Sequence, residues 1–190
     1  MALVKLNARS ATALDATVLT GNLPAISGAS LTGIAGGISE ADTYRITTSF
    51  DLDGSTDPIT ANWERVDGTA QNKLGTGITQ SSGIFSFPST GFYLVQCGWT
   101  AYGRGPVAQV GMEIHATTNN SAYSKLTNPH QAMVNNDYYG SSFGQTVIDV
   151  TDTSNVKVKF YVNSLVATTT IRGETDQTAT GMTFIRLGDT

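Results

Sequence analysis

The chain has 190 residues, which is room for one ordinary domain and a short extension. Charged residues make up only 14%, and a net charge of −4 with a pI near 5.0 argues against a nucleic-acid partner, which would need a basic face. The single cysteine, Cys97, excludes an intrachain disulfide, and no run approaches the roughly 18 apolar residues of a membrane-spanning helix, so we expect no membrane insertion.

Residues 1–43 are predicted to form a stalk or anchoring segment, distinct from the rest of the chain. They are rich in Gly and small residues, they contain no aromatic residue, and Leu19-Thr20-Gly21 recurs as Leu31-Thr32-Gly33. They also lack the apolar run of a secretory signal. The aliphatic residues are too sparse to bury themselves within one chain, so we expect them to meet symmetry mates around a shared axis: Leu19, Leu23, Ile26, Leu31 and Ile34. The alternative is a flexible tether.

Residues 44–190 are predicted to form one head domain made of β-strands. In the range 93–99 the apolar residues Tyr93, Val95, Cys97 and Trp99 occupy every second position, and the range 156–162 repeats this period of two. Turn signals such as Asp53-Gly54 separate further predicted strands near 44–51, 60–66, 76–87, 107–116, 121–134, 144–151 and 179–187. This spacing predicts an all-β sandwich or jelly roll of about eight to ten strands.

Several stretches of the head resemble a known family, the jelly roll of tumour necrosis factor and of the globular heads of complement proteins. They are the run 83–88 (GIFSFP) followed by Gly91-Phe92-Tyr93, the strand pair 146–150 and 156–160, the closing run 181–187, and Asn62-Trp63. The resemblance implies a TNF-like fold. It also implies a homotrimer, in which three jelly rolls pack around a threefold axis through aromatic-rich faces.

The run 17–34 (TVLTGNLPAISGASLTGI) resembles the short repeats of phage tail-fibre and other appendage proteins. This resemblance implies a bacteriophage structural protein that is assembled in the host cytoplasm and located in the virion. We expect a trimeric tail or head fibre, or spike, that contacts other virion proteins through its N-terminus and a host-surface glycan or protein through its head. Two alternatives stay open: a capsid decoration or cement protein without receptor binding, and a cellular TNF-like soluble binding protein.

The region from Asn119 to Ser142 is the predicted contact surface for a receptor. Tyr138-Tyr139 are expected in a polar loop, where tyrosine offers a large contact area at a small entropy cost. Packing between protomers and ordinary loop filling are the alternatives for the same residues. The candidates for receptor contact are Asn119, Tyr123, His130, Asn135, Asn136, Tyr138 and Tyr139.

Motifs that suggest metal binding or catalysis match poorly. Asp51, Asp53 and Asp57 alternate as in a calcium loop, but such a loop needs Gly where Thr56 stands and Glu where Asn62 stands. The run 140–144 (GSSFG) matches the sequence pattern of a nucleophile elbow but not its structural context, because the residues after it predict a strand rather than a helix. Cys97 is predicted to be a buried, inert thiol. We therefore expect no catalytic residues, no enzymatic activity and no cofactor.

Overall fold

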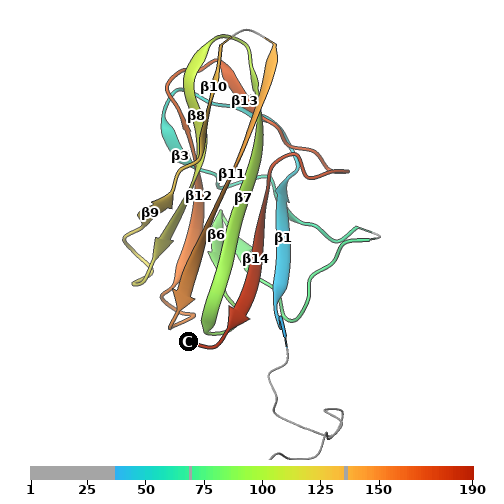
Figure 1. Ribbon diagram of the computed structural model, residues 1–190, viewed down its shortest axis with the longest axis vertical. Helices are drawn as coiled ribbons and strands as arrows, with labels where there is room; N and C mark the ends of the chain where they lie inside the picture. Colours follow the sequence, from blue (N-terminus) through green and yellow to red (C-terminus); the bar gives the residue numbers. More distant parts are fainter. Residues whose placement is uncertain (1–36, 69, 135–136) are drawn as a thin grey trace, which may run out of the picture. The chain divides into compact units, whose positions relative to one another are not determined.

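The computed structural model describes residues 37–68, 70–134 and 137–190 (Figure 1). Most of the predicted stalk therefore lies outside the described residues, including Leu19, Leu23, Ile26, Leu31 and Ile34. The receptor-contact candidates Asn135 and Asn136 also lie outside them. The first described strand begins at Ala41, at the end of the predicted stalk.

The head is an all-β sandwich of two antiparallel sheets, as predicted, and within the described residues every strand pair is antiparallel. The first sheet contains β1 (Ala41–Ile46), β2 (Phe50–Asp51), β4 (Trp63–Arg65), β7 (Gly91–Gly103), β11 (Tyr138–Val150), β13 (Thr169–Ile171) and β14 (Gly181–Gly188). The second contains β3 (Thr56–Pro58), β5 (Thr79–Ser81), β6 (Ile84–Ser86), β8 (Val107–Thr117), β9 (Ser124–Thr127), β10 (His130–Met133) and β12 (Lys157–Ser164).

Strand β7 connects several strands of the first sheet, and its burial alternates over all thirteen residues. Its odd-numbered residues are buried from end to end, and Trp99 is 1% exposed. Along its length β7 pairs with β11, β14 and β13. Figure 1 shows β7 and β11 running side by side along the long axis of the head. The predicted alternation of the range 93–99 is therefore confirmed.

The core between the sheets is organised around Phe85, from the run 83–88. Its ring centre lies 5.3 Å from that of Tyr44, 5.0 Å from Trp63, 5.2 Å from Phe160 and 5.4 Å from Phe184. Such aromatic pairs add about 0.5–1.5 kcal/mol each beyond the area they bury. These five rings come from five different strands of both sheets, so they join the two layers.

Two predicted strands are divided in the structure. The range 76–87 is the hairpin of β5 and β6, because Ser82 and Gly83 have φ of 48° and 78° and turn the chain back. The range 121–134 contains β9 and β10, separated by Asn128 and Pro129, and proline has no amide hydrogen for a sheet ladder.

Other strand boundaries also differ from the prediction. The range 44–51 is β1 and β2 with Thr47–Ser49 between them, and the hydrogen bond from the Thr47 amide to the Asn62 carbonyl is the last backbone contact between the ends of β1 and β4. The strands β3 and β13 were not predicted. All three residues of β3 are exposed, and three-residue strands are too short to establish a period of two.

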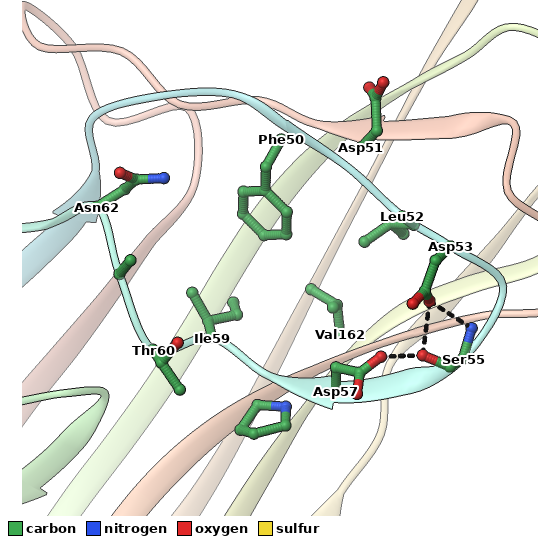
Figure 2. Close-up of a pocket in the computed structure, with 12 residues that line it drawn as sticks. Phe50, Asp51, Leu52, Asp53, Ser55, Asp57, Ile59, Thr60, Asn62 and Val162 are labelled. Atoms are coloured by element: carbon green, nitrogen blue, oxygen red, sulfur yellow. Dashed lines mark hydrogen bonds between the residues drawn. The ribbon is translucent and has the colours of Figure 1, made fainter.

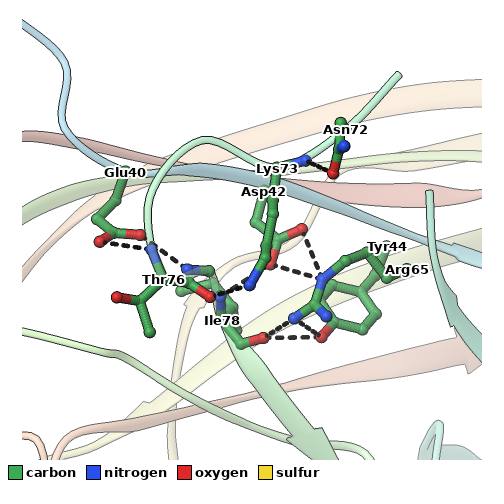
Figure 3. A network of polar contacts seen from close by, with 9 residues as sticks. Glu40, Asp42, Tyr44, Arg65, Asn72, Lys73, Thr76 and Ile78 are labelled. Carbon is green, nitrogen blue, oxygen red and sulfur yellow. Dashed lines mark hydrogen bonds and ion pairs between the residues drawn. The ribbon is translucent and has the colours of Figure 1, made fainter. Parts of the chain in front are cut away.

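A long connection between β4 and β5 is held against β1 by two carboxylates (Figure 3). Glu40 accepts hydrogen bonds from the Thr76 amide at 3.0 Å and the Gly77 amide at 2.8 Å. Asp42, only 3% exposed, accepts from the Ile78 amide at 2.8 Å and pairs with Arg65 at 3.1 Å. The polar side of β1 therefore positions a segment more than thirty residues away in the sequence.

Candidate functional site

The outward side of the first sheet carries no charged side chain along most of three neighbouring strands, β11, β7 and β14. Alternate residues of β7, β11 and β14 point away from the core, as their burial and register indicate. Charges begin at the borders, with Asp149 at one end and the Arg45–Glu64 ion pair beyond β14. We call this surface the uncharged face; it consists of Phe92, Leu94, Gln96, Gly98, Thr100, Ser141, Phe143, Gln145, Val147, Gly181, Thr183 and Ile185.

A hollow of about 350 Å³ lies in the uncharged face. Gly98 and Gly181 are paired in register, so two neighbouring strands present no side chain there. Phe143 is the partner of Gly98 on the other side and is 56% exposed. A Cβ atom at Gly98 would meet only the Phe143 ring, at 3.8 Å, so packing within the chain does not require glycine. The hollow has room for a side chain from another molecule.

The predicted polar loop at Tyr138 and Tyr139 is instead the start of strand β11, which corrects the sequence interpretation. Backbone pairing with the end of β7 extends the strand, with Tyr138 opposite Gly103 and Tyr139 opposite Tyr102. Consecutive residues of a strand point to opposite faces. The two rings, 55% and 59% exposed, therefore belong to different surfaces and do not form one contact pair.

Tyr139 lies on the same side of β11 as Phe143, and contacts within the chain fix its ring. The ring centre is 5.1 Å from that of Tyr102 and 5.4 Å from the Arg172 guanidinium carbon. Arg172 also donates to the Tyr139 hydroxyl oxygen at 2.9 Å. The Tyr102 hydroxyl donates to the Asp137 carboxylate, and this hydrogen bond raises the pKa of Tyr102. Tyr139 thus borders the uncharged face, at the end where charged side chains begin.

The other described contact candidates lie away from these tyrosines. The Asn119 side chain accepts from the amides of Ser121 and Ala122, both at 3.0 Å, and builds the turn after β8. Tyr123 lies beside Lys159, whose Nζ is 4.3 Å from the ring centre. The Asn120 amide bonds to Asn155, which follows β11, so this turn and Tyr138 lie at opposite ends of a strand about 40 Å long. The structure does not bring them together.

His130 is exposed at the start of β10, where it pairs with Gly111 on the second sheet. Its Nδ1 lies 3.0 Å from the Asn128 side-chain oxygen. The predicted contact region from Asn119 to Ser142 is therefore distributed over both sheets and both ends of the head.

A buried carboxylate on the outward side of the second sheet was not predicted from the sequence. Glu113 is fully buried, and it accepts from Lys125 at 2.6 Å, His115 at 2.6 Å and Asn163 at 3.1 Å. The His115 ring stacks on Tyr161 at 4.0 Å. Burial acts to raise the pKa of Glu113, but the three hydrogen bonds together outweigh it and hold the pKa below its ordinary value.

The predicted acidic candidates border a cavity of about 360 Å³ (Figure 2). Asp51 turns away from it, because its carboxylate pairs with Arg104 at 2.6 Å and accepts from the Thr170 hydroxyl at 2.6 Å. Asp53 accepts from the Ser55 amide at 3.0 Å and hydroxyl at 2.6 Å, and the same hydroxyl contacts Asp57. Within the described ranges, no three His, Cys, Asp or Glu side chains are grouped as a metal site.

The run 140–144 lies in the middle of β11, where it pairs with β7 from Ala101 to Cys97. A nucleophile elbow needs a sharp turn between a strand and a helix, and this straight segment does not form one. Cys97 is fully buried, and burial raises the pKa of its thiol to about 12. The prediction of a buried thiol is confirmed.

Comparison with solved structures identifies the fold. The Eiger TNF of S. frugiperda is similar at a TM-score of 0.60 and 14% identity, covering 79% of this chain and 93% of that one. Murine APRIL is similar at a TM-score of 0.56 and 13% identity, covering 78% and 98%. The head is therefore a TNF-like jelly roll, as the sequence resemblance implied.

A third similar structure is the vertex protein P5 of PRD1, at a TM-score of 0.46 and 14% identity, with 80% and 100% covered. This likeness is too weak to support an argument about function. No protein-family model matches the chain, and no curated protein sequence is similar to it. In the part of the chain that the structure describes, no helix is long and apolar enough to cross a membrane.

Proposed function

We propose that the protein is a homotrimeric structural component of a bacteriophage virion, a fibre or spike whose head binds the host surface. The observation that carries the trimer is the uncharged face. Depletion of charge at the centre of a surface, together with exposed aromatic residues, is typical of the core of a protein interface. The stalk-like sequence of the first 36 residues supports attachment to the virion.

The contact between copies is a side chain that enters a hollow. Phe143 protrudes from the β11 side of the face, and the hollow at Gly98 and Gly181 lies beside it. A protrusion that enters the hollow of the next copy makes a head-to-tail contact, and three such contacts close a ring about an axis. Burying the apolar part of the face contributes about 25 cal/mol per Å² removed from water.

Gly98→Arg tests this contact. The substitution places a long charged side chain in the hollow, and a Cβ at Gly98 causes no clash within the chain. We expect light scattering to give about three times the 20.0 kDa chain mass for the wild type and the mass of one chain for the variant. Ala108→Arg adds the same charge at an exposed position of β8 and should stay trimeric.

Circular dichroism and thermal melting of both variants separate loss of assembly from loss of folding. A wild-type protein that is monomeric at micromolar concentration would contradict the trimer. A Gly98→Arg protein that remains trimeric would show that another surface joins the copies.

Host binding is proposed for the surfaces that the trimer contact leaves free. A trimer presents three copies of each exposed end, so weak contacts with surface sugars or proteins reinforce one another through their effective concentration. Tyr138 at the start of β11 points away from the uncharged face and is the residue that we assign to such contacts.

A further inference from the structure

The cavity lined by β2, β3 and the connection from β3 to β4 has an apolar floor. Figure 2 shows Phe50, Leu52, Ile59 and Val162 converging on the same space from the surrounding chain. Leu52, Ile59 and Val162 are nearly completely buried, at 5%, 4% and 5% exposed, so the floor belongs to the packed core. A volume of about 360 Å³ lies at the lower end for ligand sites and suits a group as large as one long side chain.

The rim of this cavity carries negative charge that its own residues do not neutralise. Three aspartates line the cavity, and its lining contains no Lys, Arg or His. Arg104 compensates Asp51 from outside, which leaves Asp53 and Asp57 at one corner with Ser55 between them. Hydrogen bonds from the Ser55 side chain and backbone lower the pKa of Asp53, so that carboxylate is ionised at neutral pH.

The two carboxylates of the corner also share too few hydrogen-bond donors. Ser55 approaches both Asp53 and Asp57 through its hydroxyl oxygen, but a hydroxyl has a single hydrogen and can donate to one of them only. A group that brings both positive charge and several N–H hydrogens would satisfy the carboxylates and the hydroxyl oxygen together.

We propose that this cavity binds a primary alkylammonium group, the chemistry of a lysine side chain or of a free alkylamine. The ammonium has three hydrogens to donate to Asp53 and Asp57, and the alkyl stem packs on Leu52, Ile59 and Val162. A divalent metal ion would use the carboxylates but would leave the apolar floor in contact with water. The site does not depend on the trimer or on a virion location, so it goes beyond the proposed function.

Titration of the full chain with n-butylammonium, followed by NMR of labelled methyl groups, tests the site. We expect saturable shifts at Leu52, Ile59 and Val162, and these shifts should weaken as salt is added because exposed charges are screened. The control ligand n-butanol has the same stem without the charge and should give at least about fivefold weaker binding. Equal shifts with both ligands, or the same shifts with Ca²⁺ alone, would overturn the proposal.

A double substitution, Asp53→Asn with Asp57→Asn, should weaken n-butylammonium binding about fivefold or more. The matched control, Asp67→Asn with Asp176→Asn, removes the same charge from exposed positions outside the cavity lining and should bind like the wild type. Equally weak binding by both variants would show that net charge alone explains the loss of affinity, and it would contradict a defined site. Thermal melting of both variants verifies folding.

A short peptide with one lysine, compared with the same peptide acetylated at Nζ, distinguishes the two sources of the ligand. Binding of the unmodified peptide alone assigns the site to a lysine of a partner protein. Binding of n-butylammonium without either peptide assigns it to free amines.

Discussion

Glu113 lies on the outward side of strand β8, yet its side chain is fully buried. Lys125, His115 and Asn163 come from both neighbouring strands and from β8 itself, and they cover the carboxylate while they donate to it. Burial of a charge is costly unless donors surround it. These donors therefore favour the ionised form of Glu113 in the folded protein.

The pH dependence of stability tests this role of Glu113. Its pKa is lower in the folded protein than the ordinary value of 4.5, so its contribution is complete above that value and is lost as the pH falls through the folded pKa. We expect Glu113→Gln to lower the free energy of unfolding at pH 7 by about 1–3 kcal/mol and to flatten the decline below pH 4.5. Urea denaturation from pH 7 to 3 measures both effects. A variant with the wild-type acid profile would assign the decline to other carboxylates.

Tyr138 and Tyr139 are adjacent in sequence, but we expect their substitution by alanine to affect different properties of the protein. Tyr139 lies on the side of the uncharged face, so Tyr139→Ala should weaken the trimer and shift its dissociation to higher protein concentration. Tyr138→Ala should leave the trimer intact and reduce adsorption to host cells several-fold. Light scattering on dilution and an adsorption assay measure the two effects. Unchanged adsorption of the Tyr138→Ala protein would favour a decoration protein without receptor binding.

At the scale of elements, the connection from β4 to β5 depends on β1. Asp42 and Glu40 accept three consecutive backbone amides of this connection, those of Thr76, Gly77 and Ile78. The Tyr44 hydroxyl donates to the Ile78 carbonyl at 2.7 Å. Carboxylates that accept backbone N–H groups give strong, charge-assisted hydrogen bonds, so this segment is firmly attached to the first sheet.

Asp42→Asn should destabilise the head by about 1–3 kcal/mol, because it removes the charge that pairs with the half-buried Arg65. Exchange of the Ile78 amide hydrogen should become faster than that of amides in β7. Urea denaturation and hydrogen exchange measure the two quantities, with Asp67→Asn as the exposed control. Unchanged exchange at Ile78 would mean that backbone contacts alone hold the connection.

At the scale of the whole molecule, the proposed stalk and head have separate roles. Glu40 belongs to the fold of the head, so a deletion that tests the stalk should stop at residue 36. We expect the chain without residues 1–36 to form a folded trimer, because the uncharged face lies entirely within the head. The same chain should no longer enter virions, as immunoblots of purified particles would reveal. Truncated heads found on particles would refute the anchoring role.

Much of the fold could be predicted because strand alternation is a local signal. The buried positions of β7 follow from apolar residues that stand two apart. The candidate surfaces were less predictable. The period of two does not indicate how far a strand such as β11 extends, since that depends on the length of its partner.

The sequence by itself determined an all-β sandwich, a buried Cys97 and a low-charge composition, because alternation and composition are properties of the chain alone, and the family resemblance added the jelly roll. Only the tertiary structure decided that Tyr138 and Tyr139 face apart, that Glu113 is buried, and that Gly98 and Gly181 meet in a hollow. Each of these depends on the register between strands that are distant in sequence. A shift of one residue would reverse every side chain of a strand, and a local pattern does not show which distant strands pair.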